Sequence, residues 1–198
     1  MTKDNPNVRE LALYVLTEVT DRGEYSNHVL KNVLEKYQYM EKRDRAFLSR
    51  LCEGTLEQLI RIDDVLKRFS KVPVKKMKPV IRAILRLGVY QILFMDKIPD
   101  RAAVNEAVEQ VKRWGRPRAA GMINAVLRKC VASKNALPPL RGKDDADRLA
   151  LQYSHPRWLV ERLIKLLGRE EAEQLLALHN QSVPTTIQTN PLKTTPAA

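Results

Sequence analysis

The spacing of apolar residues constrains the fold of this chain more than any other feature of its sequence. Over most of the first 130 positions, apolar side chains recur at three- and four-residue steps, which places them along one face of a helix. The clearest example begins at Val8 and closes at Arg22-Gly23. The same pattern predicts further helices over residues 25–37, 42–66, 80–94, 100–114 and 117–130.

Local signals refine these predicted helices. Gly54 and the Asp63-Asp64 pair predict a kink or break in the 25-residue segment. The apolar face of residues 80–93 is broad, as is typical of the central helix of a bundle. Asp100 is expected to be the N-cap of the next helix, and Pro117 to lie in the first turn of the one that follows.

The helical periodicity of the first 132 residues predicts an all-α fold. Because the periodicity stops after residue 132, we expect a separate segment to follow. Residues 1–132 form a helical bundle, and 133–143 form a linker. A short helical segment over 144–182 holds helices near 146–153, 158–167 and 170–180. Residues 183–198 alternate as a strand does, which predicts the truncated start of a sheet-containing domain or else a tail.

Composition and cysteine usage exclude several classes of protein. Hydrophobic residues make up 44% of the 198, which excludes disordered low-complexity chains. Cys52 and Cys130 stand far apart, so they predict neither a disulfide framework nor a Cys-x-x-Cys metal site. The N-terminus has no signal-peptide pattern, and the longest uncharged run, residues 87–95, is far shorter than the roughly 20 residues that cross a bilayer. These features indicate a cytoplasmic protein.

Basic charge is concentrated in the predicted bundle. The chain has 35 Lys or Arg and 23 Asp or Glu, a net charge of +12, and residues 1–130 alone carry +10. Lys78, Arg82 and Arg86 are spaced four apart, which predicts a ridge along one helix face, extended by Lys75 if that residue is helical. A second cluster surrounds a Gly-x-Pro turn at a helix N-terminus, where free backbone N–H groups add to the attraction for phosphate. Its members are Lys112, Arg113, Arg116 and Arg118.

These clusters have two interpretations: a surface that binds nucleic acid, or simply a solvated bundle face. Two clusters together with the charge of the bundle favour nucleic acid. Trp114 lies within the second cluster and could stack on an unpaired base or plug the end of a helix. The predicted RNA-binding residues are Lys75, Lys78, Arg82, Arg86, Lys112, Arg113, Trp114, Arg116, Arg118 and Arg128.

Signals for catalysis or for a bound cofactor are weak. The three histidines are remote from one another in sequence, and both cysteines are expected to be buried structural thiols. Asn105 and Asn124 lie near apolar stripes, where a buried amide more often hydrogen-bonds to a loop carbonyl than contacts a ligand. No two glycines are closer than six positions, which excludes Gly-x-Gly and P-loop phosphate cradles.

Several segments together resemble a known family. They are Arg43-Asp44-Arg45-Ala46-Phe47, Gly54-Thr55-Leu56, residues 85–94, residues 98–108 and residues 117–128. These segments are similar to the NusB-type RNA-binding domain at the N-terminus of RsmB (Sun) class bacterial small-subunit ribosomal RNA cytosine methyltransferases. Residues 153–160, Tyr-Ser-His-Pro-Arg-Trp-Leu-Val, resemble the segment that follows this domain in that class and that stand-alone NusB factors lack.

The resemblance implies a two-part enzyme, of which this chain holds the first part. A NusB-like bundle would help to hold small-subunit ribosomal RNA. A Rossmann-like domain would transfer a methyl group from S-adenosylmethionine to carbon five of cytosine. The family's catalytic cysteines lie in settings that neither Cys52 nor Cys130 matches. We therefore expect no cofactor, no metal and no catalytic residue in this chain.

The chain differs from NusB factors at its N-terminus, and the resemblance also allows an alternative function. NusB factors have an arginine-rich N-terminus, whereas this chain offers only Lys3 and Arg9 before Leu11. The alternative function is a NusB-type transcription antitermination or protein-interaction module, with a small ribosomal protein as its partner. The oligomeric state stays open.

Overall fold

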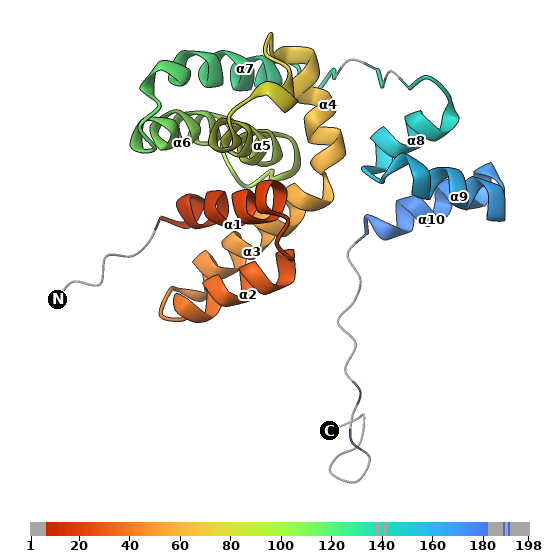
Figure 1. The fold of residues 1–198 in the computed structure, drawn as a ribbon, viewed down its shortest axis with the longest axis horizontal. Helices are drawn as coiled ribbons and strands as arrows, with labels where there is room; N and C mark the ends of the chain where they lie inside the picture. The colour runs from red at the N-terminus through yellow and green to blue at the C-terminus, as the bar shows by residue number, and fades with distance from the viewer. Residues whose placement is uncertain (1–6, 138, 141, 182–187, 189, 191–198) are drawn as a thin grey trace.

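The computed structural model describes residues 7–137, 139–140, 142–181, 188 and 190. These residues form helices and short turns, with no strand among them, as the predicted all-α class requires. Figure 1 shows a larger group of helices, α1 to α7, followed by a smaller group, α8 to α10. The α-helices are α1 (Val8–Arg22), α2 (Ser26–Lys36), α3 (Lys42–Glu57), α4 (Leu59–Phe69), α5 (Pro79–Phe94), α6 (Asp100–Arg113), α7 (Ala120–Ala132), α8 (Asp145–Tyr153), α9 (Arg157–Leu167) and α10 (Arg169–His179). Two 3₁₀ turns are η1 (Val74–Lys76) and η2 (Pro117–Ala119).

Helix α5 is the centre of the bundle. It contacts α1, α3, α4, α6 and α7, and residues 83–92 are all buried. Because its neighbours surround it, even polar side chains on this helix, such as Arg86 and Gln91, lie inside the molecule. The broad apolar face of this segment predicts that position, and the position decides which charges on the same helix reach solvent.

The long predicted helix over residues 42–66 is two helices. The break falls at Gln58, between the two positions that the sequence suggested. Gly54 stays inside α3, where a Cβ atom would clash with the phenol ring and hydroxyl of Tyr90. The missing side chain at Gly54 thus lets α3 and α5 approach each other closely.

The starts of α6 and α7 differ from the predictions by a residue or a turn. The N-cap of α6 is Pro99, and Asp100 is the first helical residue, so the prediction of an Asp100 N-cap is wrong. The Asp100 carboxylate instead accepts a hydrogen bond from Lys134 at 3.3 Å. Pro117 lies in η2, a 3₁₀ turn that leads into α7.

The smaller group of helices has its own apolar cluster and contacts the bundle through α4 and α8. Leu149, Ala150, Val160 and Leu176 form this cluster. Ser154, which ends α8 in the left-handed region at φ 56°, accepts a hydrogen bond from the Ile60 amide of α4 through its hydroxyl, at 3.2 Å. The strand predicted within residues 183–198 lies outside the described residues, apart from positions 188 and 190.

No helix within the described ranges combines the length and the apolar character needed to cross a membrane.

Candidate nucleic-acid interface

The predicted basic ridge on α5 runs from the surface into the interior. Lys78, the N-cap of α5, is exposed. Arg82 pairs with Asp21 of α1, and each side chain is only about 15% exposed. Arg86 is buried and donates two hydrogen bonds to Asp63 of α4, at 2.9 and 2.8 Å. The expected row of three exposed cations is therefore absent, because α1 and α4, which pack against this central helix, provide the carboxylates that pair with Arg82 and Arg86.

Lys75 lies in η1, ahead of α5, and not on the helix itself. It is exposed, as are Lys76 and Lys78, so the surface charge of this segment gathers at one end of α5. Whether any of these residues binds RNA stays a prediction.

The second predicted cluster divides into paired and unpaired cations. Lys112 bonds to Glu109 at 2.7 Å, and Arg113 bonds to Glu10 at 3.0 Å. Arg116 and Arg118 are exposed, and within the described part of the chain they have no carboxylate partner. Gly115, at φ 67°, provides the left-handed turn that projects this loop beyond the end of α6.

The structure brings the two predicted clusters together at one place. Lys78 lines an open pocket of about 500 Å³ with Gly115, Arg116, Pro117 and Arg118. Residues almost 40 positions apart thus supply three cations around one hollow. This arrangement suits a polyanion, because clustered cations around a concave surface reinforce one another's field.

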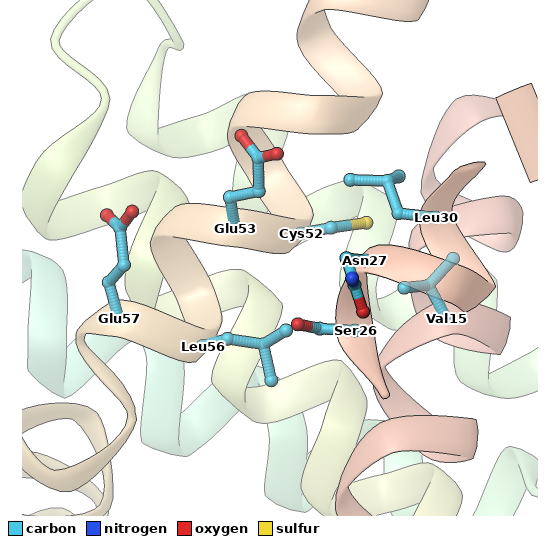
Figure 2. A pocket seen from close by; sticks show the side chains of 8 residues that line it. All are labelled: Val15, Ser26, Asn27, Leu30, Cys52, Glu53, Leu56 and Glu57. Carbon is cyan, nitrogen blue, oxygen red and sulfur yellow. The ribbon is translucent and has the colours of Figure 1, made fainter. Parts of the chain in front are cut away.

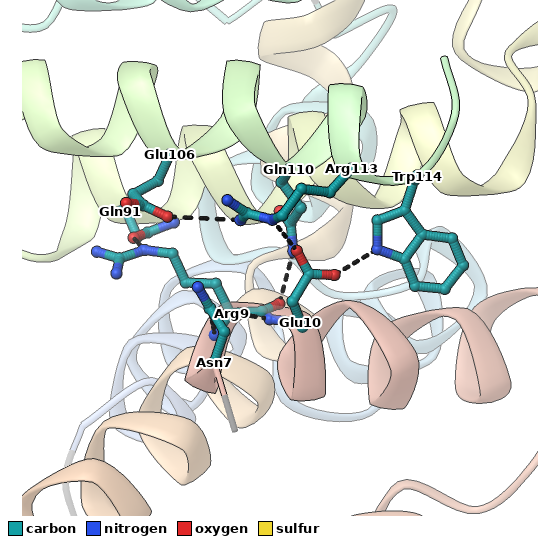
Figure 3. A network of polar contacts seen from close by, with 8 residues as sticks. All are labelled: Asn7, Arg9, Glu10, Gln91, Glu106, Gln110, Arg113 and Trp114. Atoms are coloured by element: carbon teal, nitrogen blue, oxygen red, sulfur yellow. Dashed lines mark hydrogen bonds and ion pairs between the residues drawn. The ribbon is translucent and has the colours of Figure 1, made fainter. Parts of the chain in front are cut away.

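Trp114 is neither buried as a plug nor detached from the fold. Its indole N–H donates a hydrogen bond to Glu10 of α1, and the residue is 44% exposed. The same carboxylate accepts from Arg113, whose guanidinium also lies 3.7 Å from Glu106. Figure 3 shows these side chains meeting between α1 and α6.

The network in Figure 3 also explains what Arg9 does. Its guanidinium donates to Gln91 at 2.8 Å and lies over the Phe47 ring at 5.1 Å. Burial lowers the pKa of Arg9, against the opposing effect of Glu106. The Gln110 amide donates to the Arg9 carbonyl at 2.8 Å, so this arginine is a structural member of the bundle.

Arg128 lies two turns into α7, away from the pocket at Lys78. Its guanidinium donates to Asn124 at 3.0 Å, and it lines a separate groove with Arg101 and Asn105 between α6 and α7. The predicted RNA-binding residues are therefore not gathered at one place, because Arg128 lines a groove of its own and because Arg82 and Arg86 of α5 are paired and largely covered.

Both cysteines are buried thiols. Burial raises the pKa of Cys52 to about 12, with a smaller contribution from Glu53, and it raises the pKa of Cys130 to about 12 as well. Figure 2 shows Cys52 at a pocket of about 210 Å³ between α1, α2 and α3. A thiol this weakly acidic stays protonated at neutral pH and is a poor nucleophile or metal ligand. No cluster of three or more potential metal ligands occurs among the residues that the structure describes.

The Tyr153–Val160 segment organises the smaller group of helices. Arg157 bonds to Asp144, Asp147 and Glu161 at 2.6, 2.5 and 2.7 Å, and these carboxylates raise its pKa further. The pKa of Asp144 is lowered by its hydrogen bonds, first from the Asp147 amide and then from Arg157. These contacts join α8 to α9, and they assign a structural role to this arginine.

Some features of the candidate interface could not be found from the sequence. Glu10 and Gln91 lack any local motif, although an amide within an apolar run such as residues 87–95 is a weak sign of a buried hydrogen bond. Tyr14 and Tyr37, which line a groove with Trp114, carried no signal beyond their aromatic type.

Comparison with known proteins identifies two family profiles in this chain. The profile of the NusB family matches residues 6–132. A second profile, "Methyltr_RsmF/B-like, ferredoxin-like domain", matches residues 155–198.

Among curated proteins, the probable ribosomal RNA small subunit methyltransferase B of Bacillus subtilis (strain 168) is 36% identical over 188 residues. The alignment covers 94% of this chain and 41% of that protein, so the chain spans about two fifths of the length of the curated relatives that it matches.

Solved structures share the fold. The crystal structure of PH0851 has a TM-score of 0.66 at 20% identity, covering 91% of this chain and 40% of that one. The antitermination factor complex of NusB and NusE with double-stranded RNA contains a chain with a TM-score of 0.59 at 23% identity. That likeness covers 64% of this chain and 94% of the other.

Proposed function

Because the chain belongs to the NusB family, we propose that it is the RNA-binding module of a longer small-subunit ribosomal RNA methyltransferase. The proposed activity of the whole protein is transfer of a methyl group from S-adenosylmethionine to carbon five of a cytosine, in the cytoplasm. The identity to methyltransferase B proteins over nearly the whole chain supports this proposal. The match of residues 155–198 to a methyltransferase-associated domain supports it over a stand-alone antitermination module.

The described residues of this chain do not fit S-adenosylmethionine or a catalytic cysteine. Both thiols are buried with pKa values of about 12, and neither adjoins a glycine-rich loop after a strand. We assign cofactor binding and catalysis to the part of the relatives that this chain does not span.

The meeting of Lys78, Arg116 and Arg118 at one pocket is the observation that carries the RNA-binding proposal. Each side chain is exposed, and no ion pair neutralises any of the three among the described residues. Phosphates that bind there release condensed counterions, which makes the affinity depend on salt.

A filter-binding titration of ribosomal RNA fragments against salt tests the proposal. We expect log K to fall linearly with log salt. In Lys78→Ala, Arg116→Ala or Arg118→Ala, the magnitude of the slope should drop by about 0.7–0.9 for each phosphate that the variant no longer neutralises. Lys165→Ala is the matched control, because this exposed lysine lies on α9, in the smaller group of helices. No binding at low salt, or equal slopes for all four variants, would contradict the assignment.

A further inference from the structure

A second hollow is lined by Trp114, two residues before Arg116 of the basic pocket. This groove, lined mainly by residues of α1 and α2, has a volume of about 490 Å³. This volume lies within the range of about 300–1,000 Å³ typical of small-molecule sites. Its lining residues are Leu11, Tyr14, Glu18, Glu24, Val29, Asn32, Val33, Lys36, Tyr37 and Trp114.

Aromatic surface in this groove is exposed and held in place. Tyr14 is 48% exposed and Trp114 is 44% exposed. The hydrogen bond from the indole N–H to Glu10 restrains the Trp114 ring, and the Arg113 contact restrains that carboxylate in turn. A ring held in this way loses little conformational freedom when a flat partner stacks on it.

The charges around the groove are compatible with a polyanion. Glu18 is paired with Arg22 at 2.8 Å, and Lys36 lines the groove together with Glu24. Trp114 is followed by Gly115 and Arg116, so its Cα lies at most about 7.6 Å from that of Arg116. Trp114 of the groove and Arg116 of the basic pocket are therefore close enough along the chain for one RNA strand to reach both.

Resting on the proposed RNA-binding function, we infer that this groove takes an unpaired nucleobase from an RNA strand whose phosphates lie on Arg116 and Arg118. The base stacks against Trp114 or Tyr14, as unpaired bases do on exposed aromatic side chains. The Asn32 amide has no hydrogen bond within the described part of the chain, so it can both donate to and accept from the edge of the base. RNA bound in this way must have a single-stranded or bulged position beside its helical part.

The test uses the emission of Trp114 in the 198-residue chain. Trp114 and Trp158 are the two tryptophans, so Trp158→Phe leaves Trp114 as the single reporter. We expect quenching of its emission by a single-stranded RNA oligonucleotide, and much less by a fully paired duplex of equal length. Trp114→Ala and Tyr14→Ala should each weaken single-strand binding about tenfold, with little effect on the duplex.

Tyr25→Ala is the matched control for Tyr14→Ala. Tyr25 is 76% exposed at the start of α2, outside the residues that line the groove, and its loss should leave both affinities unchanged. Circular dichroism of each variant verifies that the helices are retained.

The outcomes separate this inference from the proposed function. If Arg116→Ala and Arg118→Ala weaken both RNAs while Trp114→Ala weakens neither, the base site is refuted and the RNA-binding module stands. The base site is also refuted if single strand and duplex bind with equal affinity and the emission of Trp114 is not quenched. In that case the groove would instead accept a side chain of a protein partner. If no RNA binds at low salt, both the base site and the proposed RNA-binding function are refuted.

Discussion

At the residue scale, the two cysteines show how burial decides chemistry. Both thiols lie on apolar faces, Cys52 on α3 and Cys130 on α7, and both have a pKa of about 12. An unfolded chain returns these thiols to water, where their pKa is about 8.5. The folded state therefore holds both protons over a pH range in which the unfolded state releases them.

The predicted consequence is a loss of stability in alkali. Because the pKa of each thiol is raised in the folded state, its contribution is complete below about pH 8.5 and is lost as the pH rises toward 12. By pH 10 we expect a decrease in the free energy of unfolding of roughly 1–2 kcal/mol per thiol. Urea unfolding at pH 7, 9 and 10 measures this decrease in the free energy of unfolding.

The control for this effect is the Cys52→Ala, Cys130→Ala double variant. It removes the two thiols but keeps every tyrosine and lysine that also titrates in alkali. The double variant should lose less stability than the parent between pH 8 and pH 10. An equal loss in both proteins would show that the thiols do not cause it.

At the element scale, α5 shows what a sequence can and cannot predict. The width of its apolar face predicts a central helix, because each residue of that face must be covered by a neighbour. The same sequence makes Lys78, Arg82 and Arg86 look equivalent, since they share one helix face. Which of them is exposed depends on where Asp21 and Asp63 lie, and these residues come from other helices. Local periodicity carries no information about such pairs.

This difference predicts unequal effects of substitution along one helix. Arg86→Ala leaves the Asp63 carboxylate, about one quarter exposed, without its bidentate partner, so we expect a loss of about 3 kcal/mol in the free energy of unfolding. Lys78→Ala, two turns earlier and exposed, should change stability by less than about 0.5 kcal/mol. Thermal or urea unfolding of both variants tests this, and similar values for the two would contradict the structure.

The candidate interface could be predicted from the sequence in its residues but not in its geometry. The sequence identifies Arg116 and Arg118 as part of a basic turn, because Gly115 and Pro117 mark the end of a helix. It could not place Lys78 beside them, since these residues are brought together by the packing of α5 against α7, the helix that follows η2. Glu10 belongs to the same class of unpredictable contact, reaching Trp114 across more than 100 positions.

At the scale of the whole molecule, the hydrogen bond between Ile60 and Ser154 links the bundle to the smaller group of helices. The Ile60 amide lies in the first turn of α4, where backbone N–H groups lack partners within the helix. The Ser154 hydroxyl supplies that partner from the end of α8. Docking of the smaller group therefore also caps a helix of the bundle.

We predict that Ser154→Ala loosens this junction. The change removes the acceptor for the Ile60 amide, so hydrogen exchange at that amide should speed up by roughly three- to tenfold, as expected for a hydrogen bond worth about 0.5–1.5 kcal/mol. Ser154→Gly tests the cause, because glycine tolerates φ 56° but also lacks the hydroxyl. If the glycine variant keeps the slow exchange of the parent, backbone conformation and not the hydrogen bond protects this amide.

The difference between paired, largely covered cations and unpaired, exposed ones has a practical consequence for handling the protein. Arg82 and Arg86 are paired at short range in poorly hydrated surroundings, where dissolved salt screens little. Lys78, Arg116 and Arg118 face solvent, where a Debye length of about 3 Å at 1 M salt removes most of their attraction for a distant phosphate. We therefore expect concentrated salt to remove co-purifying RNA while the bundle stays folded. One purification step should then yield folded protein without RNA.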